Sequence, residues 1–310
     1  MSRARHYTAA PVTHDEAAVT RARPEAPKKE NLSVTALYTA ETWGWGGLPG
    51  ADLLVSKDSR TVFCVTNFAL AIARLFNWKL RSLRHSLLHR HTMIDHLLRE
   101  SGSRQVLELA AGLSRRGIAC TQSAGVRYTE IDLAPMIAHK RELLERTEAG
   151  REALARPNLH IVEGDVLDAD LAPHTGDAGQ LFVIAEGLLM YLKPDQQRAL
   201  WRKVRALFDP PGGEPRSGTF VFDLIPACEE PPPGPIGAAL GWLMKRFTGG
   251  KGFERDPRTR DDLAAELREA GFDHVEVSEP AAVAADWGLP YPGVRTTQLL
   301  FVARVRGAGD

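Results

Sequence analysis

Four carboxylate residues stand at or near the ends of four short, mostly apolar segments. They are Glu108, Asp132, Asp165 and Glu186. Such segments are too short for helices and predict buried parallel strands. The carboxyl ends of parallel strands meet at one edge of a sheet, where open α/β sheets bind ligands. Because an ionised carboxylate only accepts hydrogen bonds, it suits ribose hydroxyls or an exocyclic amine. The four acids therefore predict a ligand site at this edge.

Small residues follow the first of these strands. Ala110, Ala111 and Gly112 would let a ligand approach the backbone closely, but the next glycine is Gly117 and no third glycine completes a dinucleotide-binding pattern. No Gly-Lys-Ser/Thr sequence follows, which excludes a phosphate-binding P-loop. A nucleoside without a pyrophosphate fits better, and S-adenosylmethionine (SAM) would place its ribose on Asp132 and its methionine part over the Gly112 turn. The alternative is an ordinary βαβ unit whose small residues only pack helix against strand.

Further residues could complete such a site. Asp165 and Val166 could bracket an adenine, with the carboxylate accepting from the amine and the valine packing on the ring. A basic set precedes the first strand: Arg81, Arg84, His85, His89, Arg90 and His91. It predicts either a solvated face or one side chain that binds the cofactor carboxylate. His85 and His89 are spaced i,i+4, but two ligands do not make a metal site, and we predict none.

Composition narrows the class of protein. The chain has 310 residues, 44% of them hydrophobic, and equal numbers of basic and acidic residues (39 each), which argues against broad nucleic-acid binding. Three separated cysteines suit a reducing compartment. No apolar run is long enough to span a membrane and no secretory signal is evident, so we expect a cytoplasmic protein that binds neither nucleic acid nor membrane.

Hydrophobic periodicity predicts the elements that position these residues. We expect a disordered tail over 1–30, a helical cap over 31–100 and a ligand-binding domain over 101–306 with a lid-like insertion at 226–258. The cap begins with a helix near 31–38, followed by a loop at 43–50 whose Trp43 and Trp45 pack on the core or line a pocket. It continues with two helices between 68 and 99 that break near 77–81.

The predicted domain alternates strands and helices. Strands are expected at 106–109, 128–132, 159–165, 181–186, 218–225, 274–279 and 296–305. Helices are expected at 135–151, from 193–195 onward, at 236–247 within the insertion and at 261–270 before Gly271. The last two strands have no helix between them and should pair antiparallel.

These segments together resemble the leucine carboxyl methyltransferase family, in the branch with bacterial polyketide O-methyltransferases of the tetracenomycin type. The matching stretches are 106–117, 128–135, 164–166 and 185–192, with Arg90 ahead of Thr92-Met-Ile-Asp95. The resemblance covers roughly residues 31–306. It implies an α/β, Rossmann-like class I SAM methyltransferase fold with a seven-stranded, mostly parallel sheet, helices on both faces and an N-terminal helical cap.

The resemblance also implies roles for single residues. Arg90 would hold the methionine carboxylate, Gly112 would allow the close turn, and Asp132 would bind the ribose. Asp165 with Val166 would bind the adenine, and Glu186 would lie beneath the ammonium group. Glu108, Ala110 and Leu133 complete the predicted cofactor-binding set. The chain departs from the family at three places: Tyr38-Thr-Ala-Glu41 has no basic residue, and Ala111 and Ser114 replace Gly and Asp.

The expected activity is O-methylation of a carboxylate or hydroxyl on a small molecule or peptide, in secondary metabolism. Methyl transfer from a sulfonium mainly needs alignment and exclusion of water. A carboxylate acceptor needs no base, whereas a hydroxyl does, and Tyr191, His89, His91 or Asp223 are the candidates by position. A catalytically silent SAM-binding scaffold subunit and a nicotinamide oxidoreductase are the alternatives. The sequence leaves the acceptor and the oligomeric state open.

Overall fold

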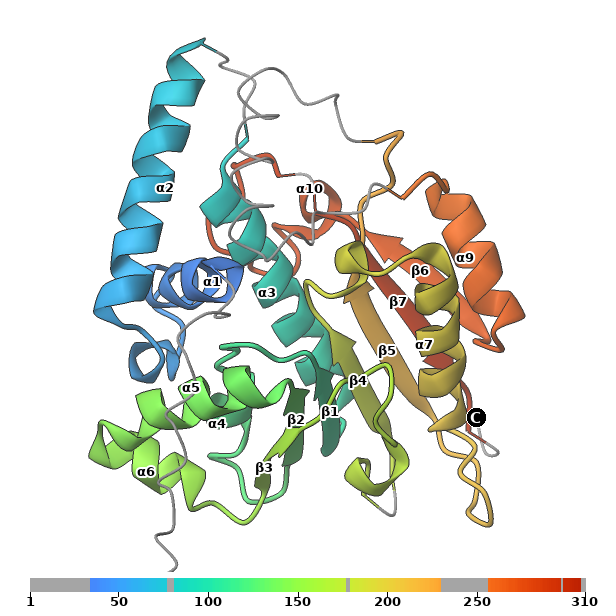
Figure 1. Cartoon of the computed structure of the whole chain (residues 1–310). Coiled ribbons are helices and arrows are strands. Elements are labelled where there is room, and N and C mark those ends of the chain that lie inside the picture. Colours follow the sequence, from blue (N-terminus) through green and yellow to red (C-terminus); the bar gives the residue numbers. More distant parts are fainter. Residues whose placement is uncertain (1–33, 77–80, 177–178, 230–255, 297, 308–310) are drawn as a thin grey trace, which may run out of the picture. The chain divides into compact units, whose positions relative to one another are not determined.

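A seven-stranded sheet forms the centre of the protein (Figure 1). The computed structural model describes residues 34–76, 81–176, 179–229, 256–296 and 298–307. The strands are β1 (Gln105–Leu109), β2 (Arg127–Asp132), β3 (Leu159–Glu163), β4 (Leu181–Ala185), β5 (Gly218–Asp223), β6 (His274–Ser278) and β7 (Leu300–Val305). Their order is β3-β2-β1-β4-β5-β7-β6, and β7 runs opposite to the other six of these strands. The predicted α/β class and mostly parallel sheet are confirmed.

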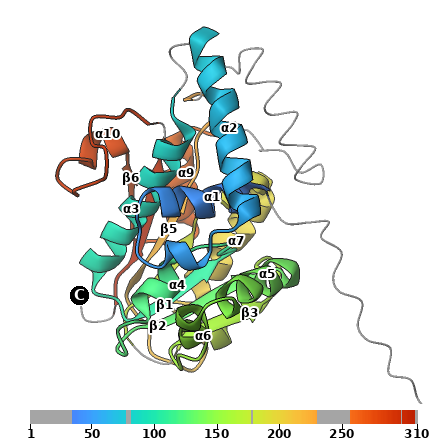
Figure 2. The ribbon, with the colours of Figure 1, turned by 90° about the vertical axis from the view of Figure 1, so that its left-hand side faces the viewer.

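Helices precede the sheet in the chain and connect its strands. They are α1 (Val34–Trp45), α2 (Lys57–Phe76), α3 (Leu83–Ser101), α4 (Arg116–Cys120), α5 (Ala134–Glu145), α6 (Glu148–Leu154), α7 (Pro194–Ala206), α9 (Arg260–Glu269) and α10 (Pro280–Val283). Short 3₁₀ turns lie at Ala51–Leu53, Ala172–His174 and Leu189–Tyr191. In Figures 1 and 2, α3 lies on one face of the sheet, and α7 and α9 lie on the other.

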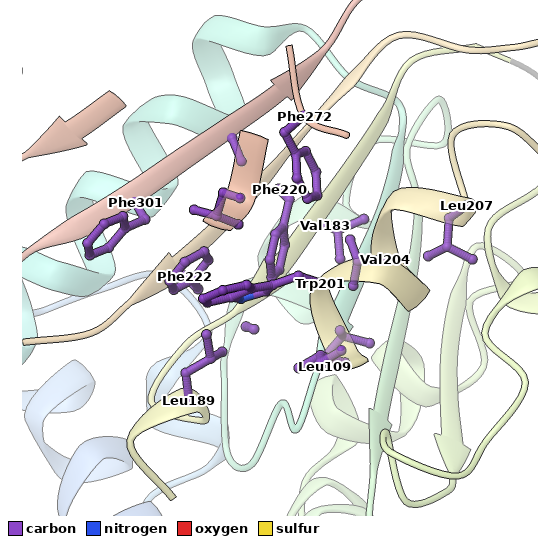
Figure 3. Close-up of a cluster of buried hydrophobic side chains, with 14 of the residues drawn as sticks. Leu109, Val183, Leu189, Trp201, Val204, Leu207, Phe220, Phe222, Phe272 and Phe301 are labelled. Atoms are coloured by element: carbon purple, nitrogen blue, oxygen red, sulfur yellow. The ribbon is translucent and has the colours of Figure 1, made fainter. Parts of the chain in front are cut away.

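The alternation of side chains along β4 explains these two layers, because successive residues of a strand point to opposite faces. Val183 packs in a core with residues of α7 and α9, whereas Ile184 packs with residues of α3. Figure 3 shows the first of these cores, where the Trp201 ring of α7 lies 5.9 Å from that of Phe222 on β5. Both rings are fully buried, so packed side chains fill the space between α7 and the sheet here.

Local sequence explains where two helices differ from expectation. The single helix predicted over 135–151 is interrupted, because Thr147 caps a second helix by accepting a hydrogen bond from the Gly150 amide at 3.0 Å. A Cβ on Gly150 would lie 2.0 Å from the Leu144 carbonyl oxygen, so the tight turn needs glycine. The helix α1 runs through Trp45 into the range expected to be a loop, and α2 begins at Lys57, ahead of the predicted start near Phe68.

Several predicted segments lie outside the described residues. The tail at 1–30 and the helix at 236–247 do so entirely, and the break near 77–81 and the insertion at 226–258 do so for the most part. The two described ends of the insertion lie together, since the Ala227 amide donates to the Asp256 carbonyl at 2.7 Å. Within the described residues, no helix has the length and apolar character needed to cross a membrane.

Candidate functional site

A cavity of about 170 Å³ lies at the carboxyl ends of the central strands. It is lined by Thr35, Ala36, Thr39 and Trp43 of α1, by Arg90 of α3, by Glu108 and the turn residues Ala110, Ala111, Gly112, Leu113 and Ser114, and by Asp132, Met136, Glu186, Gly187 and Tyr191. Six of the nine predicted cofactor-binding residues are in this set. The position agrees with the rule that open α/β sheets bind ligands at strand carboxyl ends.

The turn after β1 is held by Asp132. Its Oδ2 accepts from the Gly112 amide at 2.6 Å and its Oδ1 from the Leu133 amide at 2.7 Å. Burial raises the pKa of Asp132. The two hydrogen bonds lower it, but their effect is smaller than that of burial. Both Ala110 (φ 51°) and Gly112 (φ 54°) adopt left-handed backbone conformations, so the chain turns directly after β1, and the turn residues line the cavity.

We expect Gly112→Ala to lower the free energy of unfolding by about 1–2 kcal/mol, because a side chain disfavours a left-handed residue. Space is not the obstacle, since the nearest atom to a Cβ there would be 3.9 Å away. Gly102→Ala is the matched control, with φ 62° and open space at the end of α3. Urea denaturation should give similar losses for both variants, whereas calorimetry with S-adenosylhomocysteine should show weaker binding for Gly112→Ala alone. Equal binding by both variants would contradict a ligand at this turn.

Arg90 connects α3 to the ends of two strands. Its Nε donates to Glu186 Oε1 at 2.9 Å and its Nη1 donates to Asp223 Oδ2 at 2.8 Å. The other Asp223 oxygen accepts from the Gly187 amide at 2.5 Å. Within the described part of the chain, Nη2 of Arg90 has no hydrogen-bond partner, and it lies beside Gly187 at the cavity wall. Arg90 is thus fixed by two carboxylates with one nitrogen left for a ligand.

Glu186 receives three donors at the end of β4. Besides Arg90, Arg116 Nη2 donates to its Oε2 at 2.6 Å and His91 Nδ1 lies 2.9 Å from the same oxygen. Burial alone would raise the pKa of Glu186, but Arg116, His91 and Arg90 outweigh it and hold that pKa well below its usual range. Glu186 is therefore ionised, and its Oε1 accepts from Arg90 alone among the described donors.

Arg116 is a central residue that the sequence analysis did not identify. It is fully buried and joins three carboxylates from three elements, with 2.7 Å bonds to Asp95 and Glu108 in addition to its bond with Glu186. Glu108 also accepts from the Tyr128 hydroxyl at 2.7 Å. A glutamate inside a buried strand requires a nearby cation. The basic pair Arg115-Arg116 directly after the turn is the sequence feature from which this cation could have been predicted.

His91 is enclosed by this network and stacks on Trp43, with ring centroids 3.9 Å apart. Its Nε2 accepts from Arg115 Nε at 3.2 Å, which favours the neutral tautomer with the proton on Nδ1, directed at Glu186 at 2.9 Å. Arg116 Nη2 lies 2.8 Å from the same Nδ1, so this nitrogen is in contact with a donor as well as an acceptor. Burial and then Arg116 hold the pKa of His91 well below its usual value. Both ring nitrogens are engaged, which leaves His91 without a position for catalytic proton transfer.

The neutral state of His91 predicts a pH effect on stability. Below about pH 6.5 the unfolded histidine gains a proton that the folded one does not, so stability falls by up to about 1.4 kcal/mol per pH unit. His91→Asn keeps a donor near Glu186 but cannot titrate, and should have a flatter pH profile between pH 6.5 and 5. Parallel profiles in urea denaturation would contradict the assignment.

Comparison with the variant is needed because a second buried group acts in the opposite direction. Glu130 of β2 pairs with Lys140 of α5, and both are fully buried. Burial raises the pKa of Glu130 to about 7, so between about pH 4.5 and 7 the folded state holds a proton that the unfolded state releases. Its contribution to stability therefore falls as pH rises, and it cancels in the difference between wild type and His91→Asn.

The other predicted site residues lie outside this cavity. Asp165 is exposed on the same sheet edge, where its Oδ1 accepts from the Leu167 amide at 3.0 Å. The adjacent Gly164 amide donates to the Asp132 carbonyl at 2.9 Å. Val166 is 5% exposed and packs in the core, whereas Leu133 is 50% exposed.

The two candidate bases named first in the sequence analysis differ in position. His89 is fully buried and does not line the cavity, because its Nε2 contacts the Pro290 carbonyl at 2.7 Å and its Nδ1 the Thr296 hydroxyl at 3.1 Å. Tyr191 lines the cavity, with its hydroxyl 3.4 Å from that of Thr35. Burial raises the pKa of Tyr191, which weakens it as a base at neutral pH.

A larger cavity of about 440 Å³ lies at the opposite ends of β4 and β5, near His274 and Arg304. It is remote from the turn and from the strand ends where this kind of sheet binds ligands, so we take the smaller cavity as the site. No group of three or more potential ligands for a metal ion occurs among the side chains that the structure describes.

The strand order, the reversed β7 and the cavity beside the β1 turn define the class I methyltransferase fold. The model of the family described as leucine carboxyl methyltransferase matches residues 49–205, just over half of the chain. The chain belongs to the leucine carboxyl methyltransferase family.

Several relatives carry the printed name "Putative S-adenosyl-L-methionine-dependent methyltransferase". One from Parafrankia sp. (strain EAN1pec) is 29% identical over 194 residues, which cover 56% of this chain and 61% of the relative. One from Mycolicibacterium smegmatis is 36% identical over 138 residues, covering 44% and 42%. The matched regions thus span less than two thirds of these relatives. Among solved structures, the glycopeptide N-methyltransferase MtfA has a TM-score of 0.45 and 19% identity, covering 70% of this chain and 87% of that chain.

Proposed function

We propose that this protein transfers the methyl group of SAM to an oxygen of a small molecule or peptide. The observation that carries the proposal is that Arg90, Asp132 and Glu186, from three separate elements, line one cavity beside the Gly112 turn. The Arg90 guanidinium suits the methionine carboxylate, the Asp132 carboxylate suits the ribose hydroxyls, and the Glu186 carboxylate suits the ammonium group. Family membership and the names of the relatives support the same cofactor.

Each residue has a defined part in the proposed binding mode. Nη2 of Arg90 would bind the methionine carboxylate, Oε1 of Glu186 the ammonium group and Asp132 the ribose hydroxyls. Ligand pockets usually enclose roughly 300–1,000 Å³, more than this cavity does. The adenine would therefore extend past Leu133 to the exposed Asp165, which lies along the same edge.

The acceptor that best fits the site is a carboxylate. A bound sulfonium supplies an activated methyl group, so the chain has to align the acceptor oxygen and exclude water. A hydroxyl acceptor would also need a base. Tyr191, which lines the cavity, has a raised pKa, and His91, which lies behind Trp43 and does not line the cavity, is neutral with both ring nitrogens engaged. A carboxylate is already ionised at neutral pH and needs no base.

The biological setting is proposed from the resemblance to polyketide O-methyltransferases, which favours secondary metabolism. Equal numbers of acidic and basic residues favour a small-molecule or peptide substrate over nucleic acid.

Two measurements test the proposal in sequence. Calorimetry with S-adenosylhomocysteine should give saturable binding at one site, and absence of binding at millimolar ligand would contradict it. Tritiated SAM incubated with small-molecule and peptide extracts of the native organism should then give a labelled product. Loss of the label in mild base identifies a methyl ester, whereas a base-stable product identifies an ether or N-methyl group and contradicts the carboxylate assignment.

A catalytically silent SAM-binding subunit is the second candidate. Its support is that Tyr38-Thr-Ala-Glu41 lacks the basic residue expected from the family resemblance and that Glu41 instead accepts from Ser59 at 2.9 Å. Binding of S-adenosylhomocysteine without methyl transfer to any extract would favour this reading.

A further inference from the structure

An apolar stripe runs along the outer face of α2. Val65, Phe68, Ile72 and Leu75 expose 63%, 70%, 43% and 82% of their surface. Their spacing of three, four and three residues places all four on one side of a helix. Phe63 and Ala73 face the other way and are buried. Scattered apolar residues are normal on a surface, but a contiguous row of this kind marks an interaction site.

The residues around the stripe make it unusual for a solvated helix. Residues 61–73 contain no charged side chain, although α2 begins and ends near Lys57, Arg60 and Arg74. Exposed helix faces normally carry charge. The row instead has the alternating three- and four-residue spacing of a helix–helix seam, flanked by the small residues Cys64, Ala69 and Ala71 that permit close approach.

We propose that α2 packs against α2 of a second copy of this chain and forms a weak, concentration-dependent dimer. A two-fold interface requires a surface that complements itself. Antiparallel pairing about the middle of the stripe sets Val65 against Leu75 and Phe68 against Ile72 of the other copy. Because no charge lies along residues 61–73, bringing two copies together causes no like-charge repulsion there.

The size of the stripe sets the strength of this association. A large apolar side chain has roughly 150–200 Å² of surface, so four at these exposures offer on the order of 400 Å² per copy. Stable interfaces bury about 800 Å² per partner, and smaller ones are transient. We therefore expect a dissociation constant in the micromolar range, below about 200 µM.

Pairing would also brace the wall of the cavity. In Figures 1 and 2, α2 lies beside α1 and extends beyond it. The Tyr38 hydroxyl of α1 donates to Asn67 of α2 at 3.2 Å, and the Tyr38 and Phe63 rings are 5.2 Å apart. Thr35 and Thr39, next to Tyr38 on α1, line the cavity, so a fixed α2 limits the movement of that wall.

Sedimentation velocity of the full chain from about 1 to 200 µM tests the proposal. The wild type should shift from monomer toward dimer, and Phe68→Glu with Leu75→Glu should remain monomeric at every concentration. Ala124→Glu, in an exposed turn, is the matched control and should dimerise like the wild type. The milder pair Phe68→Gln and Leu75→Gln guards against a folding defect, and circular dichroism should match the wild type.

Two results would overturn the proposal. One is a wild type that stays monomeric at 200 µM, and the other is a Phe68/Leu75 variant that dimerises as well as the control. A third variant tests whether the insertion of the same chain, rather than a second copy, covers the stripe. If the wild type is monomeric but replacement of residues 231–254 by a short Gly-Ser linker produces a dimer, the insertion covers the stripe and the second copy does not.

Discussion

Asp132→Ala is expected to lower the affinity for S-adenosylhomocysteine by about 10²–10⁴-fold. Hydrogen bonds to a charged group contribute roughly 1.5–3 kcal/mol each, and the proposed ribose offers two hydroxyls to one carboxylate. The variant also loses the bonds from the Gly112 and Leu133 amides that fix the turn. Calorimetry measures the loss directly.

Glu163→Ala is the matched control for this variant. Glu163 ends β3 directly opposite Asp132 in the strand register, but it is exposed and does not line the cavity. It should bind the ligand like the wild type. A comparable loss in both variants would mean that general surface charge, rather than the Asp132 position, supports binding. An unchanged affinity in Asp132→Ala would contradict the proposed ribose site.

Arg116→Met is expected to lower the free energy of unfolding by about 3–5 kcal/mol, because it leaves buried carboxylates without their cation. Glu108 and Glu186 are almost completely buried, and Arg116 bonds to both. Arg116→Lys should recover only part of the loss, since one ammonium group cannot reproduce the forked geometry of a guanidinium. Urea denaturation at pH 7 is the measurement.

The exposed Arg104, just before β1, supplies the control for this experiment. Arg104→Met should change stability by less than about 0.5 kcal/mol, as surface substitutions usually do. If Arg116→Met lost no more than that, the buried cluster would not depend on its central cation. We further expect Arg116→Met to weaken ligand binding, because Glu186 would no longer be held in place.

The sequence predicted the strands well because each is a short apolar segment with clear ends. It also placed Asp132 and Glu186 at the same edge, since parallel strands bring corresponding positions together. Arg90 was singled out within a basic set only through the family resemblance. These predictions concern position in the fold, and local pattern is sufficient for them.

The partners of these residues could not be predicted in the same way. Arg90 reaches Asp223 across 133 residues, and Arg116 reaches Glu186 across 70. Such contacts depend on how helices pack on the sheet, which apolar periodicity does not specify. The break between α5 and α6 depends similarly on the Thr147 cap and the Gly150 turn, which a continuous helical pattern conceals.

The cluster around Arg90 and Arg116 has an electrostatic consequence for turnover. Within the described residues that form it, four carboxylates, Asp95, Glu108, Glu186 and Asp223, face three guanidinium groups, while His91 is neutral. The cluster therefore carries one surplus negative charge in a largely buried region, and Asp132, which lines the same cavity, adds a further carboxylate. SAM is a net cation, and loss of its methyl group as the reaction proceeds leaves a net neutral molecule. The same buried imbalance that attracts the methyl donor would then favour departure of the spent product.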